Sequence, residues 1–161
     1  MTRLLNWPGH TWLAVPARWY LAFVFIYACL HKIAHPDMFA LDVATYDILP
    51  LSLINLMAIT LPWVELFAGA MLILGFRVRG ASLAIAGMMV MFMVAIIIAL
   101  DKGLDMACGC FASQTTEEDP ISYLTVLRDS GWLFLSGYVA IFDRNALGID
   151  RLLKKRRKSH A

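Results

Sequence analysis

The stretch GASLAIAGMMVMFMVAIIIAL, residues 80–100, decides the fold class of this chain. Its 21 residues include no charged side chain. At about 1.5 Å per residue, a helix of this length extends about 31 Å and would cross the hydrocarbon core of a bilayer. A backbone in lipid must satisfy its own hydrogen bonds, so we expect a transmembrane α-helix here. Gly80 and Gly87, with Gly69 in the preceding apolar segment, are small enough to let the second and third predicted helices approach closely.

Three further apolar segments accompany this one, at residues 16–34, 51–74 and 122–142. The whole chain is 60% hydrophobic and 16% charged, whereas soluble domains are closer to half apolar and a quarter charged. We therefore expect an all-α integral membrane protein folded as an antiparallel four-helix transmembrane bundle. Residues 1–143 would form this four-span domain, and residues 144–161 would form a basic cytoplasmic tail.

Lysine and arginine are distributed unequally between the two sides of the predicted bundle. The two loops on one side contain Lys32, Lys102 and eight acids, whereas the other side carries eleven basic residues. These are Arg3, Arg18, Arg77, Arg79, Arg144, Arg151, Lys154, Lys155, Arg156, Arg157 and Lys158. Because segments rich in Lys and Arg stay in the cytoplasm, both termini are expected there. The chain would then be a multi-pass protein of the bacterial inner membrane, with the loop between the third and fourth helices in the periplasm.

Cys108 and Cys110 stand one glycine apart in that periplasmic loop. In an oxidising compartment such a pair can form a disulfide, and Gly109 supplies the backbone freedom that so small a ring needs. A small exposed ring adds little stability and exchanges readily. The pair therefore indicates thiol–disulfide exchange, in which one sulfur forms a mixed disulfide with a partner and the other resolves it. Lys102 or Arg128 would lower the pKa of the attacking thiol.

Other roles for the cysteines stay open. A structural disulfide could form within the pair or between one of its members and Cys29, although Cys29 also fits a buried small side chain. His31 and His35, one helical turn apart, could join the two thiolates of the pair in a zinc or copper site. A histidine pair near a helix end is a weak indication by itself, so no metal is expected.

A carboxylate is expected inside the membrane. Glu65 follows Pro62 by three residues in the middle of the second apolar segment, and an unpaired charge at that depth is costly. Either an arginine of a neighbouring helix neutralises Glu65 and holds the bundle in register, or Glu65 belongs to a site for a proton or a quinone headgroup. Arg128 and Asp129 in the fourth, least apolar segment are candidates for the same site or for a simple interfacial pair.

Several motifs together give the chain a likeness to a known family. They are RWYLAFVFIYACLHKIAHPDMFA, YDILP, LPWVELFAGAMLILG, DKGLDMACGCF and YLTVLRD, in that order within about residues 15–142. The chain resembles the DoxX-like membrane proteins and, within them, the MauE (methylamine utilisation) branch. The resemblance implies a four-helix membrane bundle tied to redox chemistry in the cell envelope, with thioredoxin-like partners and, in related DoxX-type subunits, quinone as electron acceptor. It carries the family's cysteine motif to Cys108 and Cys110, its acid to Glu65 and its basic residue to Arg128.

The expected function is that of a cell-envelope thiol–disulfide redox protein. It would exchange disulfides or electrons with a periplasmic thioredoxin-like or substrate protein, and a quinone is a candidate electron acceptor. The lipid bilayer is the other expected partner, and no nucleic acid is. Two alternatives stay open: a non-catalytic membrane scaffold or maturation subunit with a structural disulfide, and a metal-handling membrane protein. Whether the protein is an oxidoreductase depends on which of these holds.

Overall fold

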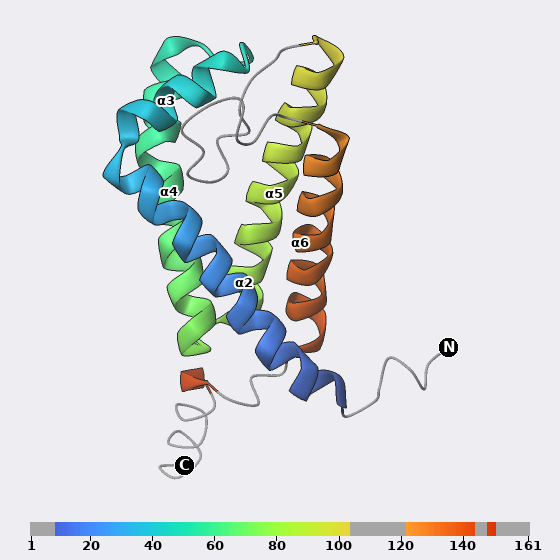
Figure 1. Cartoon of the computed structure of the whole chain (residues 1–161). Coiled ribbons are helices and arrows are strands. Elements are labelled where there is room, and N and C mark those ends of the chain that lie inside the picture. Colours follow the sequence, from blue (N-terminus) through green and yellow to red (C-terminus); the bar gives the residue numbers. More distant parts are fainter. Residues whose placement is uncertain (1–8, 104–121, 144–147, 151–161) are drawn as a thin grey trace.

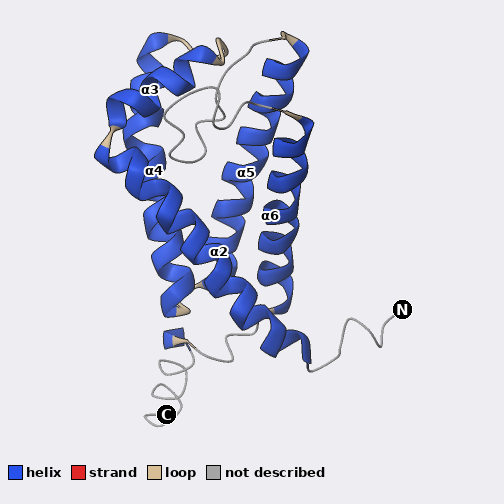
Figure 2. Cartoon of the chain, viewed as in Figure 1, coloured by secondary structure: helices blue, strands red, loops and turns tan. Residues whose placement is uncertain are grey.

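The computed structural model describes residues 9–103, 122–143 and 148–150 of the 161-residue chain. Its described helices are four long ones that pack side by side and a short one, α3, at one end (Figures 1 and 2). In chain order they are α2 (Gly9–Ala34), α3 (Pro36–Thr45), α4 (Leu51–Leu74), α5 (Val78–Asp101) and α6 (Tyr123–Phe142).

The long helices pack against one another, and the two ends of the molecule carry different segments. α2 packs against α4 and α6, and α5 likewise packs against α4 and α6. The end that carries α3 also holds the last turn of α5 and the first turn of α6 (Figure 1). The opposite end holds the start of α2 and the α4–α5 turn (Figure 1). We call these the α3 end and the turn end.

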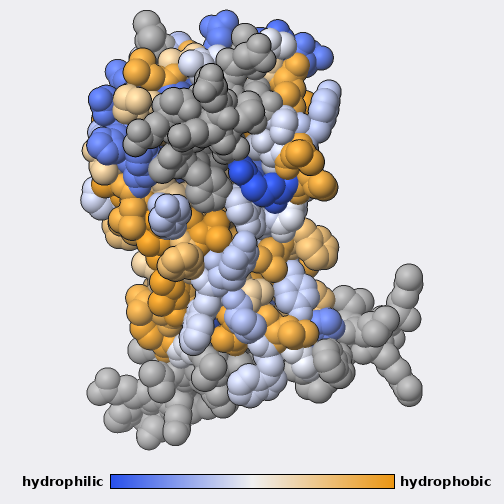
Figure 3. Space-filling model, in the orientation of Figure 1, coloured by the Kyte–Doolittle hydropathy of each residue, from blue (hydrophilic) through white to orange (hydrophobic). Residues whose placement is uncertain are grey.

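Three of the described helices are long and apolar enough to cross a membrane: Trp12–Ala34 in α2, Ser52–Leu74 in α4, and Val78–Asp101. α6 does not reach the same hydropathy, because it carries Arg128, Asp129 and several small polar residues. Large apolar side chains are exposed along the long helices and form much of the orange surface in Figure 3. Exposed apolar surface of this extent is typical of contact with lipid. The protein is therefore a membrane protein whose described elements are all helices, and the crossing of α6 stays a prediction.

The first helix is longer than the sequence predicts. The prediction began at Pro16, whereas α2 begins at Gly9 and contains Pro16 in its interior. Proline lacks an N–H group, so the carbonyl of Trp12 loses its helical donor. Ala14 and Val15 are buried against the rest of the molecule, and this packing holds the first turns in helical form despite the lost bond.

A short helix lies where the sequence indicates only a loop. Pro36 occupies the first turn of α3, where its missing N–H costs nothing, and Asp37 places a negative charge at the same helix end. Phe39 and Val43, four residues apart, are the buried side chains of α3. Two buried positions make too short a pattern to distinguish a helix from a loop.

The close helix contact that was expected from small residues involves a different pair of helices. A Cβ at Gly69 would lie 2.7 Å from Ile26 Cγ1, so the bare backbone of α4 lets α2 approach at this point. Gly80 and Gly87 of α5 are exposed, and a methyl group at either would meet no heavy atom of the described residues within 4 Å. The predicted role of these glycines between α4 and α5 is therefore wrong.

Candidate functional site

The predicted catalytic pair, Cys108 and Cys110, lies outside the described residues, within 104–121. The structure places the residues that flank this segment, Gly103 after α5 and Ser122 before α6, at the α3 end (Figure 1). Ser122 is the N-cap residue of α6, and its hydroxyl accepts a hydrogen bond from the Thr125 N–H at 3.4 Å, which stabilises the start of the helix. The charged side chains near this end are the part of the predicted site that can be described.

Lys32 of α2 forms a buried ion pair with Glu65 of α4. Lys32 Nζ donates to Glu65 Oε1 at 3.0 Å and to Oε2 at 3.1 Å, and the two side chains are 5% and 2% exposed. The ammonium also lies 5.0 Å from the ring centroid of Phe39 and 5.2 Å from that of Phe92. Glu65 is thus neutralised by a neighbouring helix, but its partner is a lysine and not the expected arginine. Lys32 is a buried helical residue and not a loop cation.

A small cavity adjoins this ion pair. Its volume is about 30 Å³, enough for a water molecule. All four long helices contribute to its lining, which is Val24, Phe25, Ala28, Lys32, Glu65, Met89, Phe92, Asp129 and Trp132. An ammonium, two carboxyl groups and an indole therefore meet around one interior space.

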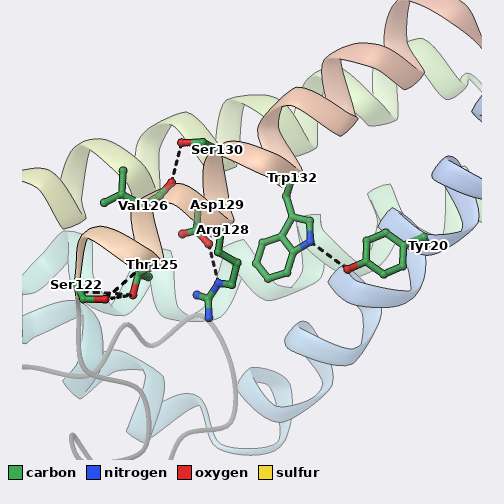
Figure 4. A network of polar contacts seen from close by, with 8 residues as sticks. All are labelled: Tyr20, Ser122, Thr125, Val126, Arg128, Asp129, Ser130 and Trp132. Carbon is green, nitrogen blue, oxygen red and sulfur yellow. Dashed lines mark hydrogen bonds and ion pairs between the residues drawn. The ribbon is translucent and has the colours of Figure 1, made fainter.

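Asp129 reaches this cavity from α6, with Arg128 beside it (Figure 4). Arg128 Nε donates to Asp129 Oδ1 at 3.2 Å; the aspartate side chain is fully buried, whereas the arginine side chain is 33% exposed. The guanidinium lies 5.1 Å from the ring centroid of Trp132, whose Nε1 donates to the Tyr20 hydroxyl at 3.5 Å. The acid therefore faces the interior while the base extends toward the surface.

Cys29 and Lys102, the other supporting residues, lie in different surroundings. Cys29 is buried in α2, one turn before Lys32, and its thiol donates to the carbonyl of Ile26 at 3.1 Å. Lys102 is exposed at the end of α5 and donates to the carbonyl of Asp47 at 3.0 Å. Lys102 thereby ties the end of α5 to the connection between α3 and α4.

His31 and His35 lie together at the end of α2, with ring centroids 5.0 Å apart. In residues 9–103, 122–143 and 148–150, no group of three or more His, Cys, Asp or Glu side chains is arranged to hold a metal ion. The two thiolates that would complete the alternative metal site lie outside these ranges. That alternative stays a prediction.

A second buried ion pair, which sequence reasoning missed, joins residues that are 125 positions apart. Arg18 Nη1 of α2 donates to Asp143 Oδ2 after α6 at 3.1 Å, and the side chains are 1% and 0% exposed. The sequence placed Arg18 at the edge of the first apolar segment and Asp143 just after the fourth. Their common position at the same side of the predicted bundle is the feature that could have suggested the pair.

A larger, apolar cavity lies between α3, α4 and α5. Its volume is about 300 Å³, at the lower limit for ligand pockets. Tyr46 contributes the one hydroxyl in a lining that otherwise consists of Val43, Ile48, Leu49, Met57, Leu61, Met91, Phe92, Val94, Ala95 and Ile98. We call Lys32, Glu65, Arg128 and Asp129 the charged cluster. Because Phe92 lines both cavities, the apolar cavity lies next to this cluster.

Comparison with known proteins confirms the MauE part of the resemblance. The family described as methylamine utilisation protein MauE matches residues 10–142. Methylamine utilization protein MauE of Paracoccus denitrificans is 31% identical over 113 residues, which make up 70% of this chain and 60% of that protein. The protein of the same name from Methylophilus methylotrophus is 33% identical over 140 residues, 86% of this chain and 73% of that protein.

No solved structure matches the chain, and the wider likeness to DoxX-like proteins stays a prediction. The family match extends from the first turn of α2 to the last residue of α6, so it includes the whole charged cluster. The chain therefore belongs to the MauE family.

Proposed function

We propose that this protein is a four-span protein of the bacterial inner membrane that supports methylamine utilisation by thiol–disulfide exchange with a periplasmic partner. α2, α4, α5 and α6 would be the antiparallel spans, with both termini in the cytoplasm and the cysteine loop in the periplasm. The unequal distribution of Lys and Arg supports this orientation. The printed names of the two MauE relatives support the link to methylamine utilisation.

The observation that carries the redox proposal is the position of the residues that flank the cysteine loop. Gly103 and Ser122 lie at the α3 end. The first two turns of α6, which follow the N-cap residue Ser122, carry Arg128 and Asp129 into the charged cluster. A thiol pair attached at this end has cations near both of its attachment points, Lys102 and Arg128, and cations stabilise a thiolate.

The proposed reaction oxidises a dithiol of the partner. A thiolate of the partner attacks one sulfur of the Cys108–Cys110 disulfide, which breaks the S–S bond and forms a mixed disulfide. The partner's second thiolate then attacks the mixed disulfide and releases the reduced pair. The partner gains a disulfide, and two electrons with their protons reside on Cys108 and Cys110.

We propose a membrane quinone as the acceptor that regenerates the disulfide. Two thiols and one quinone yield one disulfide and one quinol, so two electrons and two protons are transferred. The apolar cavity of about 300 Å³ supports this choice, because its lining suits a hydrocarbon chain. The polar groups of Lys32 and Glu65 lie beyond Phe92, around a space too small for a quinone ring.

The test uses Cys108→Ser and Cys110→Ser, with Cys29→Ala as the matched control that removes the buried thiol of α2. In intact cells, a membrane-impermeant maleimide applied after gentle reduction should label the pair in Cys29→Ala. In a methylamine-using host without its own MauE, each serine variant should accumulate the partner in the thiol form and lose growth on methylamine. Cys29→Ala should do neither.

Other outcomes favour the alternatives. Disappearance of the membrane protein itself in both serine variants would indicate a structural disulfide and a scaffold role. Failure of the impermeant reagent to reach either sulfur would reject the proposed orientation. Stoichiometric zinc or copper that is lost on mutation of His31 and His35 would indicate metal handling.

A further inference from the structure

The charged cluster holds one acid more than the pairing of α2 with α4 requires. Lys32 and Glu65 already neutralise each other through hydrogen bonds of 3.0 and 3.1 Å. Asp129 adds a second carboxyl group, 0% exposed, to the lining of the same small cavity. The desolvation of a further buried ion is costly, and ionisable side chains inside membrane bundles commonly mark proton relays. The cavity that both acids line is therefore a candidate proton site.

The size and the polar lining of this cavity suit one water molecule. A buried water needs a space of about 10–15 Å³ and two to four polar partners, and the volume here is about 30 Å³. The Lys32 ammonium carries three N–H donors and directs two of them at Glu65, so a third can serve a water. A carboxylate has about four acceptor positions. Glu65 and Asp129 can therefore each bind the water and keep their ion pairs.

Arg128 connects this cavity to the α3 end. Its Nε donates to Asp129 Oδ1 at 3.2 Å, and its side chain is 33% exposed (Figure 4). Both residues lie in the first two turns of α6, which begins at the α3 end (Figure 1). The Arg128–Asp129 pair therefore extends from the cavity lining to the molecular surface.

Other titratable groups lie near the cluster without lining the cavity. The charges of His31 and Lys32 act on the carboxyl group of Asp42 in α3. Cys29, one turn before Lys32 in α2, donates to a backbone carbonyl. The residues of α5 that line the cavity, a methionine and a phenylalanine, carry no titratable group. Asp42 is thus the other acid through which a proton could approach Lys32, and it is the comparison for Asp129.

We infer that the cavity is a proton-transfer site in which one bound water molecule links Asp129 to Glu65. A proton that enters at Asp129 from the α3 end passes to the water, and the water passes one of its own protons to the Glu65 carboxylate. One O–H bond forms for each that breaks, and Lys32 keeps its charge throughout. Release of the proton follows the reverse path. This site goes beyond the exchange chemistry of the cysteine loop and needs neither a thiol nor a quinone.

The test follows the protonation of Glu65 by infrared spectroscopy. The chain contains three glutamates, Glu65, Glu117 and Glu118, so Glu117→Gln/Glu118→Gln leaves Glu65 as the sole one. In the full-length protein of this background in detergent, with ¹³C-labelled glutamate carboxyl groups, a rapid drop in pH should replace the labelled carboxylate band by a carboxyl C=O band. Asp129→Asn in the same background should slow this conversion on the order of a hundredfold, because a positioned acid that relays a proton contributes a factor of this size.

Ala28→Val tests the role of the water, because Ala28 lines the cavity and the larger side chain fills it while every ionisable group stays in place. This variant should slow the protonation of Glu65 as Asp129→Asn does. Ala22→Val, at another buried alanine of α2 that does not line the cavity, is its matched control. Asp42→Asn is the matched control for Asp129→Asn. Both controls should keep the rate of the background protein.

Three results would overturn the inference. They are an unchanged rate in Asp129→Asn or Ala28→Val, an equal loss in Asp42→Asn, and a Glu65 carboxyl that stays ionised at every pH at which the protein is folded. The thermal unfolding temperature of each variant identifies any slow protonation that comes from unfolding. If Asp129→Asn does not fold, the comparison of Ala28→Val with Ala22→Val decides.

Discussion

Lys32 donates to both carboxylate oxygens of Glu65, at 3.0 and 3.1 Å, and so joins α2 to α4 inside the molecule. The same helix carries Arg18 four turns earlier, where it is paired with Asp143 after α6. α2 therefore brings two positive charges into the interior, and each is matched by an acid from a different part of the chain. These two pairs connect α2 to α4 and to the end of α6.

Breaking the Lys32–Glu65 pair from one side is expected to destabilise the protein strongly. Lys32→Met leaves the buried carboxylate without its cation, at a cost of about 3–5 kcal/mol. Lys32→Met combined with Glu65→Met should recover most of the loss, because two apolar side chains of similar length need no charge partner. Thermal unfolding in detergent measures both. A double variant as unstable as the single one would show that the charges have a further structural role.

The Arg18–Asp143 pair should behave as a coupled unit in a double-mutant cycle. Arg18→Met and Asp143→Leu each leave one buried charge uncompensated, so each alone should lower the unfolding temperature. The double variant should lose less than the sum of the single losses, with a coupling energy of about 1–3 kcal/mol. Additive effects of the two substitutions would contradict a direct pairing between α2 and the end of α6.

A side chain at Gly69 should force α4 away from α2. Gly69→Val places a Cβ where Ile26 Cγ1 lies 2.7 Å away, and overpacking of this kind costs about 1–3 kcal/mol. Gly87→Val is the matched control, because Gly87 is exposed in α5. The unfolding temperature should fall for Gly69→Val and change little for Gly87→Val. Equal losses at both positions would indicate an effect of helix propensity and not of the contact.

Asp42 of α3 is expected to make stability depend on pH. Burial raises the pKa of its carboxyl group, and the charges of His31 and Lys32 offset part of this increase. A carboxyl with a raised pKa stabilises the fold while protonated, below the unfolded value of about 4, and this stabilisation is lost as the pH rises through the folded pKa. Asp42→Asn should therefore raise the unfolding temperature at pH 7, and its advantage should vanish near pH 3.5.

The unfolding temperature of Asp37→Asn, measured over the same pH range, is the control for Asp42→Asn. Asp37 is exposed and lies in the first turn of the helix, where its negative charge is favourable. This variant should not raise the unfolding temperature at pH 7. If Asp42→Asn were less stable than the wild type at pH 7, the burial of its carboxyl would not govern the pH dependence.

The local sequence pattern was sufficient to predict the long apolar helices. The apolar segment predicted at 51–74 has the bounds of α4, and Pro36 ends the first helix near the expected place. Local pattern was not sufficient for α3, whose burial depends on contact with α4, or for the first turns of α2 ahead of Pro16. In both cases packing against distant residues stabilises a helix that its own sequence indicates only weakly.

The sequence by itself determined that this is a helical membrane protein of the MauE family, because uncharged runs and family motifs are properties of the chain alone. The tertiary structure decided which residues meet: Lys32 with Glu65, Arg18 with Asp143, Gly69 with Ile26, and Asp129 with the cavity beside the first pair. The physical reason is that an apolar run specifies a helix but not the neighbour it faces. That choice depends on the packing of side chains and the pairing of buried charges between segments far apart in the chain.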